Sequence, residues 1–308
     1  ATYNAPRQIL YPFGCNASQK RGVENALTHQ VSIIQGPPGT GKTQTILNIV
    51  ANLLVQGKSV LIVSNNNSAV ENVAEKLSDK KIGLGFLVAQ LGKKENKEAF
   101  VENQPAVPDI SDWELPEWRR TAEEINEKLQ IVSKGFEKQT ILSKLKIEAE
   151  ALKIESRYNE LQKRPIVSDF DWLHLKPSRQ LLTLKRRYET QIEQSKKLGT
   201  VFYIEWLFRF GFKMWTFLHQ SPDVITREIE AAYYTARKNE IESEIANCES
   251  FLKSIDITEN VSALQDLSLQ MLKHQIFIGR QGRNRRLFSV KDIKPRTEEF
   301  LKEYPVVL

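Results

Sequence analysis

Eight consecutive residues near the amino terminus combine glycine, lysine and threonine at a spacing that suits contact with phosphate. They are Gly36, Pro37, Pro38, Gly39, Thr40, Gly41, Lys42 and Thr43. The glycines allow successive N–H groups to point at phosphate oxygens, and the positive end of a following helix reinforces this attraction. The Lys42 ammonium suits the β- and γ-phosphates, and the Thr43 hydroxyl suits Mg²⁺. The pattern predicts a nucleotide site made by these residues and the adjacent Gln44, with Lys42 and Thr43 as its catalytic members.

The segments on either side of this loop are those that a phosphate site requires. Residues 31–35, Val-Ser-Ile-Ile-Gln, form a short β-branched run that predicts a buried strand. Apolar residues then recur at helical spacing from Thr43 until Gly57, which predicts a helix that begins at the loop. The order of strand, glycine-rich loop and helix favours a true site. The alternative is a glycine-rich turn that only starts a helix.

Three further segments continue the alternation of strands and helices. Residues 59–63 and 85–90 are apolar runs that predict strands, the first with helices over both of its faces. Residues 67–77 predict a helix with Asn67 or Ser68 as its N-cap and an apolar face toward the core. The alternation predicts an α/β fold built on a RecA-like parallel sheet.

The rest of the chain is predicted to be mainly helical. Two long stretches, residues 118–163 and 223–255, repeat apolar residues at alternating intervals of three and four. Such seams favour two helices paired as an antiparallel coiled-coil arm, with an ordinary helical bundle as the alternative. The predicted domains are the sheet core at 1–104, a helical insertion at 105–286 and a return to the core at 287–308.

Between the two long stretches lies a segment rich in aromatic residues. Residues 200–218 contain eight aromatic side chains in nineteen positions. Glu205, Arg209 and Lys213 interrupt them, which makes a membrane span a poor interpretation and predicts no membrane partner. Two interpretations remain: a packing core that ties the helices together, and an exposed surface for a protein partner or for nucleobases.

The positive charge of the chain is concentrated in one short stretch. The net charge is +6, while residues 273–296 alone hold eight basic side chains and one acidic side chain. This stretch contains the glycine-flanked residues Arg280, Arg283, Arg285 and Arg286. Planar guanidinium groups on a flexible backbone suit a phosphate backbone, so these four are candidate nucleic-acid contacts. A solvated run of charge is the alternative.

Two segments that flank the loop carry a family resemblance. Residues 16–19, Asn-Ala-Ser-Gln, precede the loop, and residues 64–72, Ser-Asn-Asn-Asn-Ser-Ala-Val-Glu-Asn, follow the second predicted strand. Together with the loop, they resemble the Q motif, motif Ia and motif I of superfamily-one helicases of the Upf-like branch. The resemblance is strong over residues 10–92 and only architectural over 105–286.

The resemblance implies a function and roles for particular residues. It implies ATP and Mg²⁺ as cofactors, single-stranded DNA or RNA as a partner, and a helicase or translocase as the whole enzyme. Gln19 would hydrogen-bond the adenine edge, with a surface position on a helix as the alternative. Ser64, Asn66 and Asn67 would line the path of the strand, and a plain N-cap is the alternative for Asn67.

One element of the family pattern does not occur in this sequence. Motif II is an apolar strand that ends in Asp-Glu, and the nearest candidates, Asp169 and Asp171, follow residues 165–168, Pro-Ile-Val-Ser, which are too few for that strand. We expect motif II and the second RecA-like domain to lie past Leu308, and the chain to bind ATP with Mg²⁺ but hydrolyse it poorly. The alternatives are an AAA+ ATPase, a coiled-coil ATPase of the SMC type, and a nucleotide-gated scaffold whose arm recruits a protein.

The cysteines and the start of the chain bear on its location. Cys15 and Cys248 lie far apart and lack the spacing of metal ligands, which favours a reducing cytoplasm over a disulfide-bonded secreted protein. No basic-then-apolar signal opens the chain, which begins with Ala1. We therefore expect a piece of a longer cytoplasmic polypeptide.

Overall fold

The computed structural model describes residues 8–92, 94–161, 168–195 and 198–308. They form two compact units, one made of residues up to 137 together with 255–308, the other of residues 138–254. The boundaries predicted at 105 and 286 differ from this division, because the segments beside both boundaries pack with the first unit.

The first unit contains a small parallel sheet. Its strands are β1 (Val60–Leu61), β2 (Val88–Ala89) and β3 (Val306–Val307), in the order β1-β3-β2. Val306 pairs with Val60 on one side and with Val88 on the other. The last residues of the chain therefore form the central strand, between two strands that lie more than two hundred positions earlier in the sequence.

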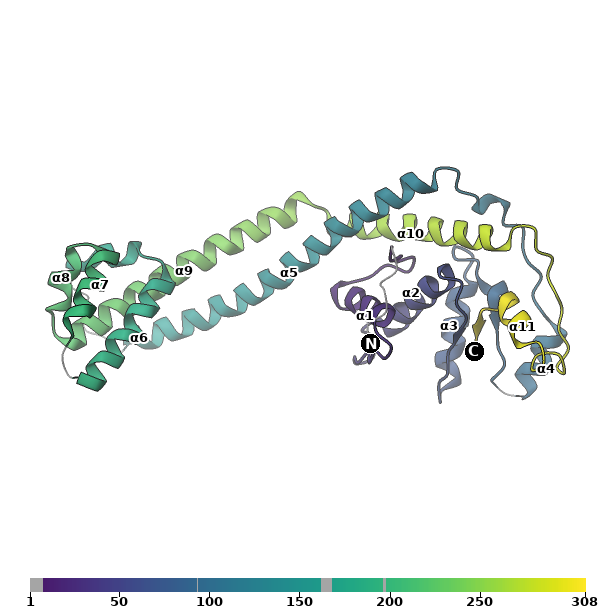
Figure 1. Cartoon of the computed structure of the whole chain (residues 1–308), viewed down its shortest axis with the longest axis horizontal. Coiled ribbons are helices and arrows are strands. Elements are labelled where there is room, and N and C mark those ends of the chain that lie inside the picture. Colours follow the sequence, from purple (N-terminus) through teal and green to yellow (C-terminus); the bar gives the residue numbers. More distant parts are fainter. Residues whose placement is uncertain (1–7, 93, 162–167, 196–197) are drawn as a thin grey trace. The chain divides into compact units, whose positions relative to one another are not determined.

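Helices surround this sheet. They are α1 (Ala17–Thr28), α2 (Lys42–Val55), α3 (Asn67–Ser78), α4 (Lys94–Glu102), α10 (Ile257–Arg280) and α11 (Thr297–Glu303), with short 3₁₀ turns η1 (Gly85–Leu87) and η2 (Ser111–Trp113). The core includes Val23, Leu47, Leu77 and Leu264, which come from four different helices. Helix α10 packs against α2 (Figure 1) and was not among the predicted elements. Its sequence nevertheless holds the signals of a helix, with Asp256 as N-cap and buried apolar residues at helical spacing.

Two predictions about the sheet are wrong. Residues 31–35 are not a buried strand, because Val31 and Ile33 are 79% and 82% exposed and no described strand pairs with them. Strand β1 is covered on one side only, since Leu61 and Val63 are also exposed. The second predicted strand and the third are present but short, and residues 85–87 form the turn η1 instead of extended chain.

The second unit is helical. It holds the later part of α5 (Trp118–Leu161), the 3₁₀ segment η3 (Ser168–Leu175), and helices α6 (Ser178–Ser195), α7 (Thr200–Phe210), α8 (Lys213–Leu218) and α9 (Pro222–Ser254). The two predicted long helices are confirmed as α5 and α9, although residues 162 and 163 lie outside the described part of the chain. The same holds for 165–167, the residues before the candidate acids Asp169 and Asp171.

Helices α5 and α9 pack against each other within this unit (Figure 1). Leu145 and Leu152 of α5 form a buried cluster with Ile241 and Cys248 of α9. Ion pairs flank this apolar seam, for example between Arg237 Nη2 and Glu148 Oε1 at 2.7 Å. The apolar spacing read from the sequence therefore corresponds to a real contact between the two helices.

The aromatic segment 200–218 forms α7 and α8 and supplies much of a second core. Its buried side chains include Trp206, Met214 and Phe217, which pack with α6, α9 and η3. The packing interpretation is confirmed for this half of the segment, while other side chains of the same two helices are exposed. Among the described residues, no helix is both long and apolar enough to span a membrane.

Candidate nucleotide site

The glycine-rich loop is an open turn that ends at the amino terminus of α2. Residues 36–40 are exposed, and Gly41, the N-cap of α2, has a left-handed φ of 79°. A Cβ on Gly41 would come within 2.0 Å of Gln19 Nε2, and one on Gly36 within 2.6 Å of Thr40 Oγ1. No side chain caps the first turn of α2, so its N–H groups are free for an anion.

Lys42 places its charge at the loop. Its Nζ donates to the carbonyl oxygens of Gly36 at 2.5 Å and Pro37 at 2.9 Å, and Thr40 Oγ1 donates to Pro37 O at 2.8 Å. The ammonium is thus held at the loop that leads into the uncapped end of α2. A cation and several amide donors in one open turn fit a polyphosphate, and both kinds of donor strengthen when the acceptor is charged.

Thr43 occupies the second position of α2 and is half-buried. Among the residues that the structure describes, its hydroxyl has no hydrogen-bond partner, so it is free to bind a metal ion. In the described part of the chain, no three His, Cys, Asp or Glu side chains come together in a group that could hold a metal ion. Because Mg²⁺ commonly takes only one or two protein ligands and completes its shell with phosphate and water, Thr43 alone still fits the ion.

Gln19 is buried against the loop instead of lying on the surface of a helix. Its Oε1 accepts from Asn16 N at 2.9 Å in a capping box at the start of α1. Its Nε2 donates to Thr40 O, Gly41 O and Gln44 Oε1 at 3.0–3.3 Å. The alternative of a surface position is therefore wrong, because the side chain is only 7% exposed. Contact between Gln19 and adenine stays a prediction. It would require the Gln19 amide to replace some of these hydrogen bonds with bonds to the base.

Amides on α2 hold the segment before the loop, and of these only Gln44 was among the residues predicted from the sequence. We call Gln44, Asn48 and Asn52 the amide ladder, because they recur every fourth residue on one helix face. Asn52 bonds both the N–H and the carbonyl of Leu10, at 2.9 and 2.7 Å, and Asn48 donates to Gly14 O at 2.8 Å. The signal was present as amides at positions i, i+4 and i+8 of an otherwise apolar helix.

The amide ladder also reaches the loop itself. Gln44 Nε2 donates to Phe13 O while Gln44 Oε1 accepts from Gln19. These side-chain amides align residues 10–19 with the phosphate loop, in addition to the apolar packing of Leu10 and Tyr11 against α2. Cys15 lies in the same segment, and burial raises the pKa of its thiol to about 12, which keeps the thiol protonated at neutral pH.

The predicted strand-contacting residues follow β1. Ser64 and Asn66 are exposed, and Asn66 is the N-cap of α3, where its Oδ1 accepts from Ser68 N at 3.0 Å. The sequence predicted Asn67 or Ser68 as the N-cap of this helix, and that prediction is wrong by one residue or two. Asn67 is the first residue of the helix, and its exposed side chain has no partner in the described chain. Its amide is consequently open for contact with a ligand.

The four candidate arginines divide into two pairs. The side chains of Arg280 and Arg285 are 8% and 10% exposed, and both approach the buried carboxylate of Glu303. Arg280 Nη2 lies 2.8 Å from Glu303 Oε2, and Arg285 Nη2 donates to Phe86 O at 2.6 Å. These two arginines fasten the end of α10 and the chain after it to α11 and η1. Their burial does not agree with the prediction that all four arginines contact a phosphate backbone.

The other pair remains on the surface. Arg283 is exposed and unpaired among the described residues, and Arg286 is exposed with an ion pair to Glu299 at 2.8 Å. An exposed ion pair of this kind is weak and can yield to another anion. Arg283 and Arg286 are therefore the candidates that remain for a nucleic-acid contact.

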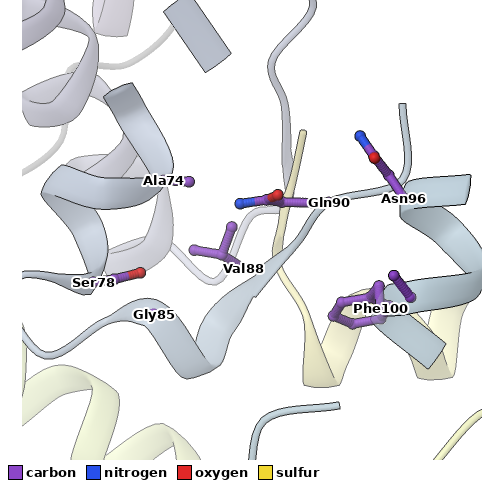
Figure 2. A pocket seen from close by; sticks show the side chains of 8 residues that line it. Ala74, Ser78, Gly85, Val88, Gln90, Asn96 and Phe100 are labelled. Carbon is purple, nitrogen blue, oxygen red and sulfur yellow. The ribbon is translucent and has the colours of Figure 1, made fainter. Parts of the chain in front are cut away.

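A pocket of about 280 Å³ lies between α3, β2 and α4. Figure 2 shows Val88 and Gln90 between Ala74 of α3 and Phe100 of α4. None of the residues predicted from the sequence to form a site lines it. This pocket is therefore separate from the glycine-rich loop.

A glycine-rich loop at the start of a helix, beside a parallel sheet with helices around it, defines a P-loop nucleotide-binding domain. A family model described as an AAA domain matches residues 14–257. The chain belongs to this family.

Three relatives illustrate the match. "DNA polymerase alpha-associated DNA helicase A" of Schizosaccharomyces pombe is 41% identical over 68 residues, 22% of this chain and 10% of the relative. "Regulator of nonsense transcripts 1 homolog" of Arabidopsis thaliana is 48% identical over 64 residues, 20% of this chain and 5% of the relative. "ATP-dependent helicase NAM7" of Saccharomyces cerevisiae is 41% identical over 91 residues, 29% of this chain and 9% of the relative.

These matches confirm the resemblance to Upf-like superfamily-one helicases over the residues they cover. The aligned part of the chain spans a tenth or less of the length of these relatives. No solved structure matches the chain.

Proposed function

We propose that this chain is the ATP-binding part of an ATP-dependent nucleic-acid helicase or translocase. The observation that carries the proposal is the Lys42 ammonium held at the carbonyls of Gly36 and Pro37, in a loop that matches the phosphate-binding pattern and leads into the uncapped end of α2. The helicase class comes from the relatives, two of which are named as helicases.

The residues of the loop divide the work of holding ATP. The N–H groups at the start of α2 would bind phosphate oxygens, and Lys42 would exchange its bonds to Gly36 and Pro37 for bonds to the β- and γ-phosphates. Thr43 would hold Mg²⁺, which neutralises phosphate charge when bound. Gln19 and the amide ladder would keep residues 10–19 aligned beside the nucleotide.

Hydrolysis by this chain alone is expected to be poor. Phosphoryl transfer needs metal, water and counter-charge positioned together, and the sequence contains no apolar strand that ends in Asp-Glu. We infer that ATP with Mg²⁺ binds to this chain without efficient turnover.

We propose single-stranded nucleic acid as the binding partner of this chain. Ser64, Asn66 and Asn67 follow β1 and present amide and hydroxyl groups to solvent, and Arg283 and Arg286 present guanidinium groups. Amides and hydroxyls suit sugar and base edges, and arginines suit phosphates. DNA and RNA would both satisfy this chemistry.

The packed helices α5 and α9 support a second candidate function. We propose that residues 138–254 form an antiparallel coiled-coil arm that recruits a protein partner through segment 200–218, in a nucleotide-gated scaffold. The exposed aromatic side chains of α7 and α8 favour this idea. A cytoplasmic location is proposed from Cys15 and Cys248, which are both unpaired and buried.

Replacement of Lys42 by alanine tests the nucleotide site. We expect ATP–Mg²⁺ to bind the Lys42→Ala variant roughly 100-fold more weakly, because one charge-assisted contact is lost. Isothermal calorimetry measures the affinity, with Lys58→Ala as the control, an exposed lysine just beyond the other end of the same helix. Equal affinity in the Lys42→Ala variant and the wild type would refute the site.

Replacement of Gln19 by alanine tests the adenine contact. The Gln19→Ala variant should lose preference for ATP over GTP, while Gln30→Ala, at an exposed position, should keep it. Competition between the two nucleotides for a fluorescent analogue measures the ratio. A ratio that stays the same in Gln19→Ala leaves this residue as a brace for the loop only.

A further inference from the structure

Helices α7 and α8 are apolar on two sides. One side, with Phe202, Trp206 and Phe210, is buried in the core of the second unit. The other side is exposed and consists of Val201, Ile204, Phe208, Phe212 and Trp215, which we call the aromatic ridge. Phe208 and Phe212 are 89% and 93% exposed. A helix that is apolar all round is normally buried all round, so a body that covers the aromatic ridge is expected.

The arrangement of the aromatic ridge favours a helix as that body. Along α7 its members are spaced by three and then four residues, the spacing of side chains that face another helix. Exposed apolar side chains continue past the end of α7 with Phe212 and, on α8, with Trp215. Val201 and Ile204 cannot stack on nucleobases, whereas they pack well against leucine or isoleucine of a helix.

The charges beside the aromatic ridge are mainly positive. Lys213 is exposed and has no acidic partner in the part of the chain that the structure describes. Glu205 is the one acidic residue between 200 and 218, and both Arg187 and Arg209 pair with it. Two arginines on one carboxylate leave a positive excess.

This charge pattern argues against a second copy of the same surface. Two copies of the ridge would carry the same positive excess at Lys213 and Arg209, and segment 200–218 offers no acidic group besides Glu205, which is already paired, to balance it. Like charges across an interface are costly, whereas acidic groups on a partner would gain from the same positions.

We propose that the aromatic ridge binds an amphipathic helix of a partner protein whose apolar face is flanked by aspartate or glutamate. The apolar face would cover Phe208 and Phe212, and the acidic flanks would pair with Lys213 and with the excess charge at Arg209. This inference names the partner class for the proposed surface at 200–218 and rests on that proposal. It does not depend on the nucleotide site.

Four probes added to the whole chain test the partner class. They are a fluorescein-labelled synthetic helix with a leucine face and glutamate flanks, the same helix with lysine flanks, an oligothymidylate, and vesicles that contain phosphatidylserine. The glutamate-flanked helix should bind saturably and at least roughly ten-fold more tightly than the lysine-flanked one. Added NaCl should weaken its binding, because the flanking pairs are exposed.

A double variant locates the binding. Phe208→Ser with Phe212→Ser should weaken binding of the glutamate-flanked helix by at least roughly ten-fold, since both rings lie at the centre of the proposed contact. The far-UV circular dichroism should not change, because both side chains lie outside the core. The control is Ile147→Ser with Ile154→Ser, two exposed isoleucines of α5 in the same unit, which should leave the affinity unchanged.

Several results would overturn the proposal. An acidic helix is rejected as the partner if the two helices bind equally well. It is also rejected if the oligothymidylate or the vesicles bind and the glutamate-flanked helix does not, or if no probe binds. An equal loss in the isoleucine control would place the contact elsewhere. Lys42→Ala should leave peptide binding unchanged, so failure at the aromatic ridge and failure of the nucleotide function remain distinguishable.

Discussion

Helices α2 and α7 both depart from the rule that polar groups lie outside and apolar groups inside, and they do so in opposite directions. Helix α2 buries two asparagines, Asn48 and Asn52, while α7 exposes Phe208. Every amide of the ladder has a partner in the chain, at the backbone of residues 10–14 or at Gln19. Nothing in the part of the chain that the structure describes covers the aromatic ridge in this way.

The difference follows from what each group loses when it lacks a partner. A buried polar group without a hydrogen bond is costly, so its presence inside identifies a partner within the fold. A large apolar group in water is also costly, but folding alone does not remove that cost when the side chain points outward. A buried amide therefore indicates an internal contact, and an exposed aromatic cluster indicates an external one.

The largest effect is expected where the buried polar group is charged. Glu303→Ala should lower the free energy of unfolding by about 3–5 kcal/mol, because Arg280 and Arg285 would keep buried charges without their carboxylate. Urea denaturation measures the change. Glu299→Ala, which breaks the exposed pair with Arg286, should cost at most about 1 kcal/mol. Equal costs at the two glutamates would break the distinction between inside and outside.

Asn52→Leu should cause the second-largest loss in the free energy of unfolding. The change removes both hydrogen bonds to Leu10 and leaves that buried backbone N–H and carbonyl without partners, at a cost of about 2–3 kcal/mol. Thermal or urea unfolding followed by circular dichroism gives the value. Asn25→Leu, at an exposed position of α1, is the matched control and should be nearly neutral. A neutral Asn52→Leu would mean that the ladder does not stabilise the segment.

Arg283→Gln should have a smaller effect, confined to binding. If Arg283 contacts phosphate, the slope of log affinity for single-stranded nucleic acid against log salt should fall by about 1, with no change in stability. Fluorescence anisotropy at several salt concentrations measures the slope. The control is Lys144→Gln, an exposed lysine of α5. An unchanged slope in Arg283→Gln would leave this arginine as a solvated charge.

The smallest effect on stability is expected at the aromatic ridge. Phe208→Ser should change the free energy of unfolding by less than about 0.5 kcal/mol, because the ring is almost fully exposed in the free chain. Ile147→Ser should behave alike under the same denaturation protocol. A large loss for Phe208→Ser would show that the ring is covered within the fold, and the contrast with α2 would fail.

The sequence predicted the local elements well where one segment contains the whole signal. The start of α2 at the glycine-rich loop, helix α3 with its buried face, and the long helices α5 and α9 all follow from spacing within the segment. Their outcome depends on neighbours a few residues away, which the sequence displays directly.

Predictions failed where the outcome depends on distant segments. Residues 31–35 have the composition of a buried strand, but burial requires pairing with a neighbouring strand. No described strand pairs with them. Arg280 and Arg285 lie in a basic run that predicted contacts with nucleic acid. Both are buried instead, and the carboxylate that pairs with them belongs to Glu303 of α11. The alternative that Gln19 lies on the surface failed likewise, because its burial comes from the loop more than twenty residues later.

By itself the sequence determined that a phosphate-binding loop is present, because glycine, lysine and threonine at fixed spacing set the backbone and the charge of one short turn. Only the tertiary structure decided which arginines are free and which aromatic side chains face solvent. Those choices depend on contacts between segments far apart in the chain, such as Arg280 with Glu303, and composition does not reveal which partner each side chain meets.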